Sequence, residues 1–208
     1  MAITARNEKA GGRHERGFTL IELMMAMTIM LLVMTAIYTT FNSQTRSWMV
    51  GQEIASMQQN LRAGMYYLER SIRMAGYDPK NSKAFGFVSN LPAPYSDRGA
   101  TTDGDDIAFT VDNDSDKVID TNSNELVAYR RNPLTSELEI LDINDSGTWK
   151  AVAQNISSVV FTYLDADNVV TNNLPDIRTV QITLTARSGR ASVTSTRSIT
   201  TRVRCRNM

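Results

Sequence analysis

The sequence predicts an α+β fold in which one long N-terminal helix packs on an antiparallel β-sheet. Three observations support it: an apolar segment near the N-terminus, apolar residues at helical spacing directly after it, and a C-terminal part in which apolar and polar residues alternate. The C-terminal part is long enough to bury a small core. Layering a sheet on the apolar face of a helix is a common α+β arrangement.

The apolar segment, residues 18–41, contains neither glycine nor proline. As a helix it would be roughly 36 Å long, which is enough to cross a bilayer. Between Leu23 and Tyr38 its only polar side chains are Thr28 and Thr35, whose hydroxyls can bond back to helix carbonyls. We therefore expect residues 18–41 to be the transmembrane half of the helix.

Apolar residues continue at spacings of three or four beyond this segment, which is typical of an amphipathic helix. They are Val50, Ile54, Met57, Leu61, Met65, Leu68, Ile72 and Ala75. Gly76, followed by Asp78 and Pro79, predicts the end of the helix. Residues 42–76 are therefore expected to form its amphipathic half.

The remaining sequence, residues 77–208, reads mainly as strands. Residues 105–112 and 176–187 alternate apolar with polar or small side chains, which predicts strands with one buried face. Residues 125–131 and 136–142, separated by a turn that contains Asn-Pro, predict a hairpin. We expect these strands to form a globular domain whose sheet covers the apolar stripe of the helix.

Glu22 is the one acidic residue of the apolar segment. A carboxylate in hydrocarbon costs on the order of a few kcal/mol unless it is neutralised or finds a cation. Arg16 is the nearest preceding cation, and an α-amine created by chain cleavage nearby would be a closer partner. A secretory signal peptide and a plain N-terminal anchor are the alternatives, but no small-residue cleavage site ends the segment convincingly.

The stretch RGFTLIEL, residues 16–23, resembles the processing and methylation motif of type IV prepilins and of type II secretion pseudopilins. The resemblance implies a type IV pilin-like fold, cleavage by a prepilin peptidase after Gly17, and N-methylation of the new amine of Phe18. It also implies that Glu22 pairs with the Phe18 amine of a neighbouring subunit and so fixes the register of assembly. Methylation would leave this amine charged.

Residues 1–17 would then be a leader peptide that cleavage removes. Its basic residues outnumber Glu8 and Glu15, so the positive-inside rule keeps the leader in the cytoplasm. The basic residues are Arg6, Lys9, Arg13 and Arg16. We expect a single-pass inner-membrane protein with a periplasmic C-terminal domain, which later moves into a pilus at the cell surface.

Residues 57–79, MQQNLRAGMYYLERSIRMAGYDP, resemble the helix end of PilW-type minor pilins and of J-type minor pseudopilins. Many major pilins carry a proline partway along the mature helix, whereas this chain has Thr39 in that region and no proline before Pro79. The resemblance implies a structural minor pilin that helps to initiate or cap a type IV pilus. The alternative is a minor pseudopilin of a type II secretion system. The implied partners are other pilin subunits, the prepilin peptidase, the inner-membrane assembly machinery and, before assembly, the lipid bilayer.

The composition argues against an enzyme. The only histidine, His14, lies in the leader, so the mature chain has no imidazole for a Ser-His-Asp triad or a His-containing zinc site. Cys205 is the only cysteine and cannot form an intrachain disulfide. No glycine-rich phosphate loop followed by Lys-Ser or Lys-Thr occurs. We expect no catalytic residue and no cofactor.

Acidic residues gather at both ends of the first predicted strand, residues 105–112. They are Asp103, Asp105, Asp106, Asp112, Asp114, Asp116 and Asp120. Carboxylates at this spacing offer the oxygen ligands that calcium prefers, but Lys117 stands where an EF-hand loop needs glycine, and Ser123 stands at the twelfth position. A solvated acidic loop is the alternative. We expect no metal site, and at most weak calcium affinity.

The last residues, 187–208, carry many arginines and no acidic residue. The arginines are Arg187, Arg190, Arg197, Arg202, Arg204 and Arg206. A basic strand could pair with an acidic loop or subunit, or attract DNA in an uptake or adhesive tip protein. A solvated edge strand protected from aggregation explains the pattern equally well. Nucleic acid is therefore not an expected partner.

Overall fold

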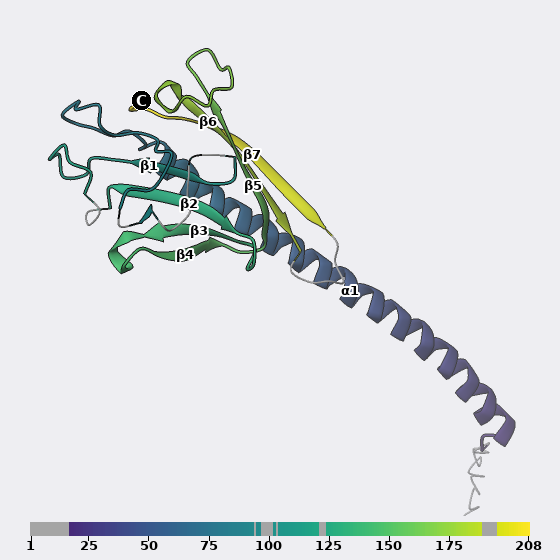
Figure 1. The fold of residues 1–208 in the computed structure, drawn as a ribbon. Helices are drawn as coiled ribbons and strands as arrows, with labels where there is room; N and C mark the ends of the chain where they lie inside the picture. Colours follow the sequence, from purple (N-terminus) through teal and green to yellow (C-terminus); the bar gives the residue numbers. More distant parts are fainter. Residues whose placement is uncertain (1–16, 94, 97–101, 103, 121–123, 189–194) are drawn as a thin grey trace, which may run out of the picture. The chain divides into compact units, whose positions relative to one another are not determined.

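The computed structural model describes residues 17–93, 95–96, 102, 104–120, 124–188 and 195–208 (Figure 1). The leader residues 1–16, Asp103, Ser123 and Arg190 lie outside the described residues. The elements in chain order are helix α1 (Leu20–Ile72), strands β1 (Ile107–Thr110), β2 (Leu126–Asn132) and β3 (Glu137–Asp142), the short 3₁₀ helix η2 (Ile143–Asp145), strands β4 (Thr148–Ala153) and β5 (Ile156–Leu164), the 3₁₀ helix η3 (Leu174–Asp176), and strands β6 (Thr179–Arg187) and β7 (Thr196–Arg204).

The chain divides into two compact units, Met1–Trp48 and Met49–Met208. In the described part of the first unit, α1 exposes apolar side chains on all sides up to Phe41, and its most apolar stretch is entirely exposed. The hydroxyls of Thr28 and Thr35 donate to the carbonyls of Met25 and Leu31, each at 2.8 Å, as the sequence predicts. Within the described residues, α1 is the helix that is long and apolar enough to cross a membrane.

In the second unit, the last part of α1 packs on the strands through one face. Its buried residues are Met57, Leu61, Gly64, Met65, Leu68 and Ile72. This confirms the predicted apolar stripe from Met57 onward, while Val50 and Ile54 are only half-buried. Helix α1 ends at Ile72, a few residues before Gly76, where the sequence predicted its end. After a turn, Gly76 takes a left-handed conformation with φ of 71°, and its N–H donates to the carbonyl of Thr110.

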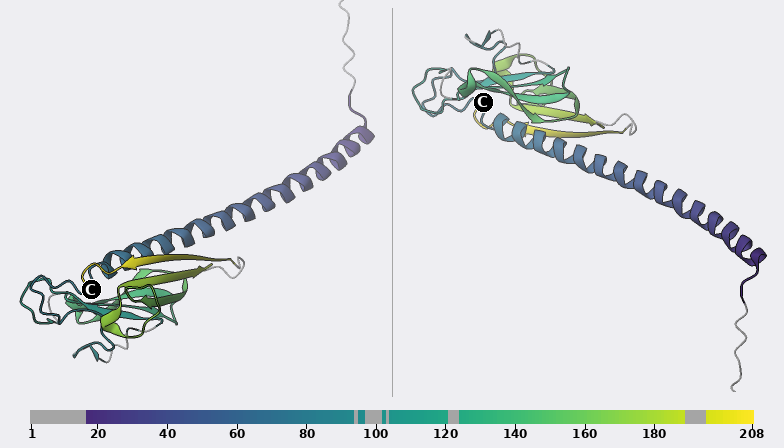
Figure 2. Two further views of the ribbon diagram at one scale, coloured as in Figure 1. Left: turned by 90° about the horizontal axis from the view of Figure 1, so that it is seen from above. Right: turned by 90° about the horizontal axis from the view of Figure 1, so that it is seen from below.

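The strands form two antiparallel sheets, where the sequence predicted one. The first has the order β1-β2-β3-β4 and the second the order β5-β6-β7. The change of sheet occurs between β4 and β5, at Asn155, whose φ is 59°. This left-handed residue redirects the chain, so β5 pairs with β6 instead of β4. Figure 2 shows β7 along the edge of the second sheet and the C-terminus close to the end of α1, where Met208 packs against Gly76.

The predicted hairpin is confirmed, since β2 pairs with β3 in antiparallel register. The alternation of β6 is also confirmed: Val180, Ile182, Leu184 and Ala186 are buried. Strand β1 differs, because all of its residues are buried. Ile107 and Phe109 belong to the main core beneath α1, and Ala108 belongs to a second cluster with Leu126 on the opposite face.

Candidate functional site

The segment before α1 carries the residues of the predicted processing site. Gly17 and Phe18 are not helical, and the Phe18 side chain is 88% exposed. No atom lies within 4 Å of the position that a Cβ on Gly17 would take. The bond between Gly17 and Phe18 is therefore in open, non-helical backbone, which is the form that a peptidase can bind.

Thr19 and Glu22 cap the first turn of α1. One carboxylate oxygen of Glu22, Oε2, accepts hydrogen bonds from the Thr19 backbone N–H at 3.0 Å and from its hydroxyl at 2.9 Å. The Glu22 N–H donates in return to the Thr19 hydroxyl at 3.3 Å. This reciprocal pair is a capping box. We did not predict the role of Thr19, although its signal, threonine followed three residues later by glutamate, is present in the sequence.

Because of the capping box, the Glu22 carboxylate has hydrogen-bond partners within a single chain, before any neighbouring subunit binds. The positive end of the helix dipole also favours an acidic side chain in the first turn. Among the described residues, the second carboxylate oxygen, Oε1, has no hydrogen-bond partner. Glu22 can therefore keep its cap and still accept a hydrogen bond from a cation outside the chain.

The first half of α1 exposes large apolar side chains around its whole circumference. Those at least half exposed between Leu20 and Phe41 are Leu20, Ile21, Leu23, Met24, Met25, Met27, Ile29, Met30, Leu31, Leu32, Val33, Met34, Ile37, Tyr38 and Phe41. A surface of this kind is stable in lipid or against other helices, and not in water. It anchors the chain in a membrane.

The acidic residues predicted near β1 are only partly brought together. Carboxylate oxygens of Asp112, Asp114 and Asp116 lie within 4.8 Å of one another. Asp120 is not part of this group, and its N–H donates to Glu125 at 2.8 Å. Glu125 is fully buried and was not predicted as part of this loop. The sequence placed it as the first residue of the predicted strand 125–131, whereas β2 begins one residue later, at Leu126.

The arginine-rich end forms the edge strand that the sequence allowed. Arg197, Arg202 and Arg204 are exposed on β7, and the Nε of Arg202 donates to the amide oxygen of Gln181 at 2.8 Å. Val203, between two of them, is buried. Arg202 and Arg204 therefore lie on the solvent side of a strand whose other side packs on the core. Arg197 pairs with Ala186, on the same side of β7 as Val203, but at the exposed start of the strand.

Cys205 is buried, with 3% of its surface exposed. Burial raises the pKa of its thiol to about 12. A thiol that remains protonated is a poor nucleophile and a poor metal ligand. The structure therefore gives Cys205 a packing role.

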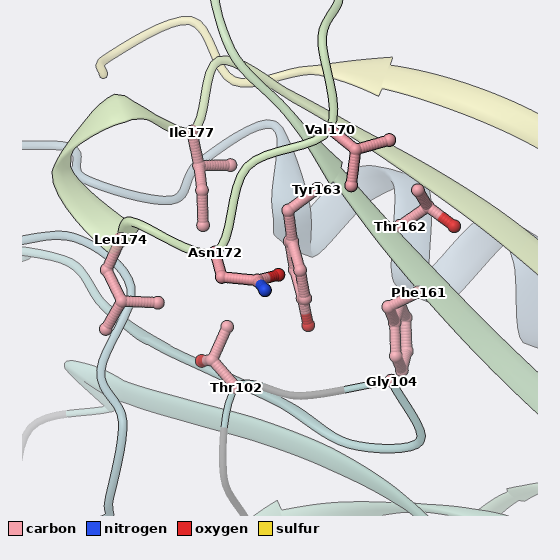
Figure 3. Close-up of a pocket in the computed structure, with 9 residues that line it drawn as sticks. All are labelled: Thr102, Gly104, Phe161, Thr162, Tyr163, Val170, Asn172, Leu174 and Ile177. Atoms are coloured by element: carbon pink, nitrogen blue, oxygen red, sulfur yellow. The ribbon is translucent and has the colours of Figure 1, made fainter.

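The cavity in Figure 3 offers no catalytic arrangement. It has a volume of about 340 Å³ and is lined by neutral side chains. The Tyr163 hydroxyl, which points into it, donates to the backbone carbonyl of Asp106 at 3.1 Å. No acid and base are paired among the residues that line this cavity.

The fold and the segment before α1 define a class of protein: a membrane-anchored, pilin-like protein with a long apolar helix on antiparallel sheets. Comparison with family models agrees with this class. The prokaryotic N-terminal methylation motif matches residues 12–38, and the model described as prepilin peptidase-dependent protein B matches residues 51–205.

The chain therefore belongs to the prepilin peptidase-dependent protein B family. Searches of curated proteins and of solved structures gave no significant match. The placement among PilW-type minor pilins stays a prediction.

Proposed function

We propose that this chain is a structural, non-enzymatic minor pilin that enters a type IV pilus and helps to initiate or cap it. The observation that carries the proposal is the start of α1, where an exposed Gly17–Phe18 bond directly precedes a capped helix with an uncovered apolar surface. Such a helix can lie in a bilayer before assembly and against the helices of other subunits afterwards.

The chain is divided accordingly. A prepilin peptidase removes the cytoplasmic leader, residues 1–17, and the Phe18 amine is methylated. Residues 18–41 span the inner membrane, residues 42–76 continue the helix, and residues 77–208 form the periplasmic domain. The inner-membrane assembly machinery then transfers the subunit into the filament.

In the filament, the free Oε1 of Glu22 accepts a hydrogen bond from the methylated Phe18 amine of a neighbouring subunit. Pairing lowers the cost of both charges in an apolar environment. It also selects one axial register between the two helices, because each subunit offers a single Glu22 carboxylate and a single Phe18 amine for this pair. The Thr19 cap need not break for this bond to form.

Intact mass and N-terminal sequencing of the membrane-extracted chain test the processing step. We expect a chain that begins at Phe18 and carries one N-methyl group, and Gly17→Val should retain the leader. A mature chain that starts elsewhere would overturn the proposal. Recovery with a secretion filament instead of sheared pili would favour the minor pseudopilin alternative.

Two substitutions separate charge from capping in the assembly step. Glu22→Gln keeps a side-chain oxygen for the capping box but removes the charge, so the cleaved chain should remain in the inner membrane and be absent from sheared pili. Thr19→Ala removes the cap but keeps the charge, and should still be incorporated. Immunoblots of the two fractions measure both. Normal incorporation of Glu22→Gln would refute the pairing role.

A further inference from the structure

The loop that follows β1 contains a buried carboxylate without a partner. Asp112 is fully buried, and neither of its carboxylate oxygens has a hydrogen-bond partner among the described residues. Its carboxylate lies within 4.8 Å of oxygens from Asp114 and Asp116, which are exposed. The buried group therefore faces the two solvent-accessible carboxylates.

A buried charge of this kind is unfavourable unless a cation compensates it. The ion pairs within the described part of the chain include Arg73–Glu69, Arg130–Glu139, Lys150–Asp142 and Lys150–Asp145, and none of these four involves this loop. Lys117, the one cation of residues 112–120, is in none of them. Repulsion among three carboxylates at this distance adds to the cost. The loop thus has a deficit of positive charge that its own side chains do not supply.

Backbone hydrogen bonds hold the loop in place around this cluster. The Asp112 N–H donates to the carbonyl of Tyr77 at 2.7 Å. Glu125 accepts from the N–H of Asn113 at 3.0 Å through one oxygen, and from the N–H of Asp120 at 2.8 Å through the other. Glu125 is thereby satisfied by the backbone, while Asp112 is not.

The conformation of Lys117 removes one of the two objections that the sequence raised, the missing glycine. A calcium loop of this type needs glycine at its sixth position, because the chain turns sharply there. Lys117 occupies that position and has a φ of 72°, in the left-handed region that glycine favours. The turn is therefore made without glycine.

We propose that Asp112, Asp114 and Asp116 bind one calcium ion. Ligands that are all carboxylate oxygens select a hard cation over zinc or copper. Magnesium requires a stricter octahedral arrangement and gives up its water reluctantly, so calcium is favoured. With only three protein carboxylates, the dissociation constant for calcium should be about 10⁻⁴ to 10⁻³ M, as in extracellular modules. The ion would clamp the connection between β1 and β2.

Thermal unfolding of the mature chain in detergent micelles tests the proposal. Five conditions suffice: EDTA, calcium at about 1 and 5 mM, and magnesium at the same two concentrations, both of which are at or above the expected dissociation constant for calcium. Calcium should raise the midpoint by a few degrees, as expected for a ligand that binds only the folded state. Magnesium should raise it by less than half as much. Calorimetry should give one calcium per chain.

Substitutions then locate the site. Asp112→Asn should leave the midpoint in EDTA unchanged or higher, because a buried charge is removed, and should abolish the calcium shift. Asp114 is exposed to solvent, so Asp114→Asn should fold normally. It should abolish the calcium shift of the midpoint, and this result tests the site even if Asp112→Asn folds poorly. Asp167→Asn, an exposed aspartate in another turn, is the matched control and should retain the shift. The absence of a calcium shift in the unmodified chain, or its persistence in Asp114→Asn, would overturn the proposal.

Discussion

Gly64 lies at the point where α1 approaches both sheets. A Cβ placed on it would lie 3.2 Å from the Cβ of Ala153 on β4, 3.2 Å from a methyl of Leu138 on β3 and 3.4 Å from a methyl of Leu184 on β6. The Leu138 methyl can shift by a rotation, but the Ala153 Cβ is fixed to its backbone. Gly64→Ala therefore requires β4 itself to move.

Two effects of Gly64→Ala oppose each other. Alanine improves helix propensity by about 1 kcal/mol, and overpacking a filled core costs about 1–3 kcal/mol. We expect the free energy of unfolding to fall by about 1 kcal/mol, since the contact with the Ala153 Cβ, which no side-chain rotation can relieve, places the cost near the middle of that range. Gly51 is the matched control, because no atom lies within 4 Å of its Cβ position, and Gly51→Ala should stabilise by about 0.5–1 kcal/mol.

Urea unfolding of the mature chain in non-ionic detergent measures both variants. Near-ultraviolet circular dichroism follows the loss of tertiary packing and gives the transition midpoint and slope. The expected difference between the two variants is about 2 kcal/mol. If Gly64→Ala were as stabilising as Gly51→Ala, the close approach of α1 to the sheets would not be a packed contact.

Two further predictions concern buried side chains. Tyr129 is fully buried and its hydroxyl lies 2.7 Å from that of Ser71, so Tyr129→Phe should cost about 1 kcal/mol in urea unfolding. Burial raises the pKa of Tyr129 above 10.0, so the folded chain keeps a proton that the unfolded chain loses; stability should fall as pH rises above about 10, and less so in Tyr129→Phe. Because the pKa of the Cys205 thiol is raised to about 12, its reaction with a disulfide reagent at pH 8.5 should be slower than in denaturant by a factor on the order of 10²–10³; equal rates would contradict its burial.

The sequence was sufficient for elements that have a strong local period. The stripe from Met57 to Ala75 and the alternation of β6 each repeat over enough residues to define a buried face. Strand β4 was not predicted, because its exposed and half-buried side chains do not alternate regularly. The division into two sheets was also missed, since the change occurs within the two residues that separate β4 from β5, one of which is the left-handed Asn155.

In the candidate sites too, the sequence revealed residues that are close in the chain and missed features that depend on folding. The residues of the processing segment are contiguous, so the sequence alone pointed to Gly17, Phe18 and Glu22, although the role of Thr19 in capping was overlooked. For the loop after β1, the sequence predicts a solvated acidic cluster with at most weak calcium affinity. Its distinctive feature is the burial of Asp112 and its lack of a partner, and no residue type or spacing reveals that.

The sequence by itself determined a long helix with an apolar first half, a strand-rich domain after it, and a prepilin-like motif at its start. These follow from local periodicity and from a continuous stretch of residues, which do not depend on distant contacts. Only the tertiary structure decided that α1 touches both sheets at Gly64, and that Glu125 and Tyr77 hold the loop around Asp112. Burial and charge compensation are properties of segments that meet in space, so they arise only when the chain is folded.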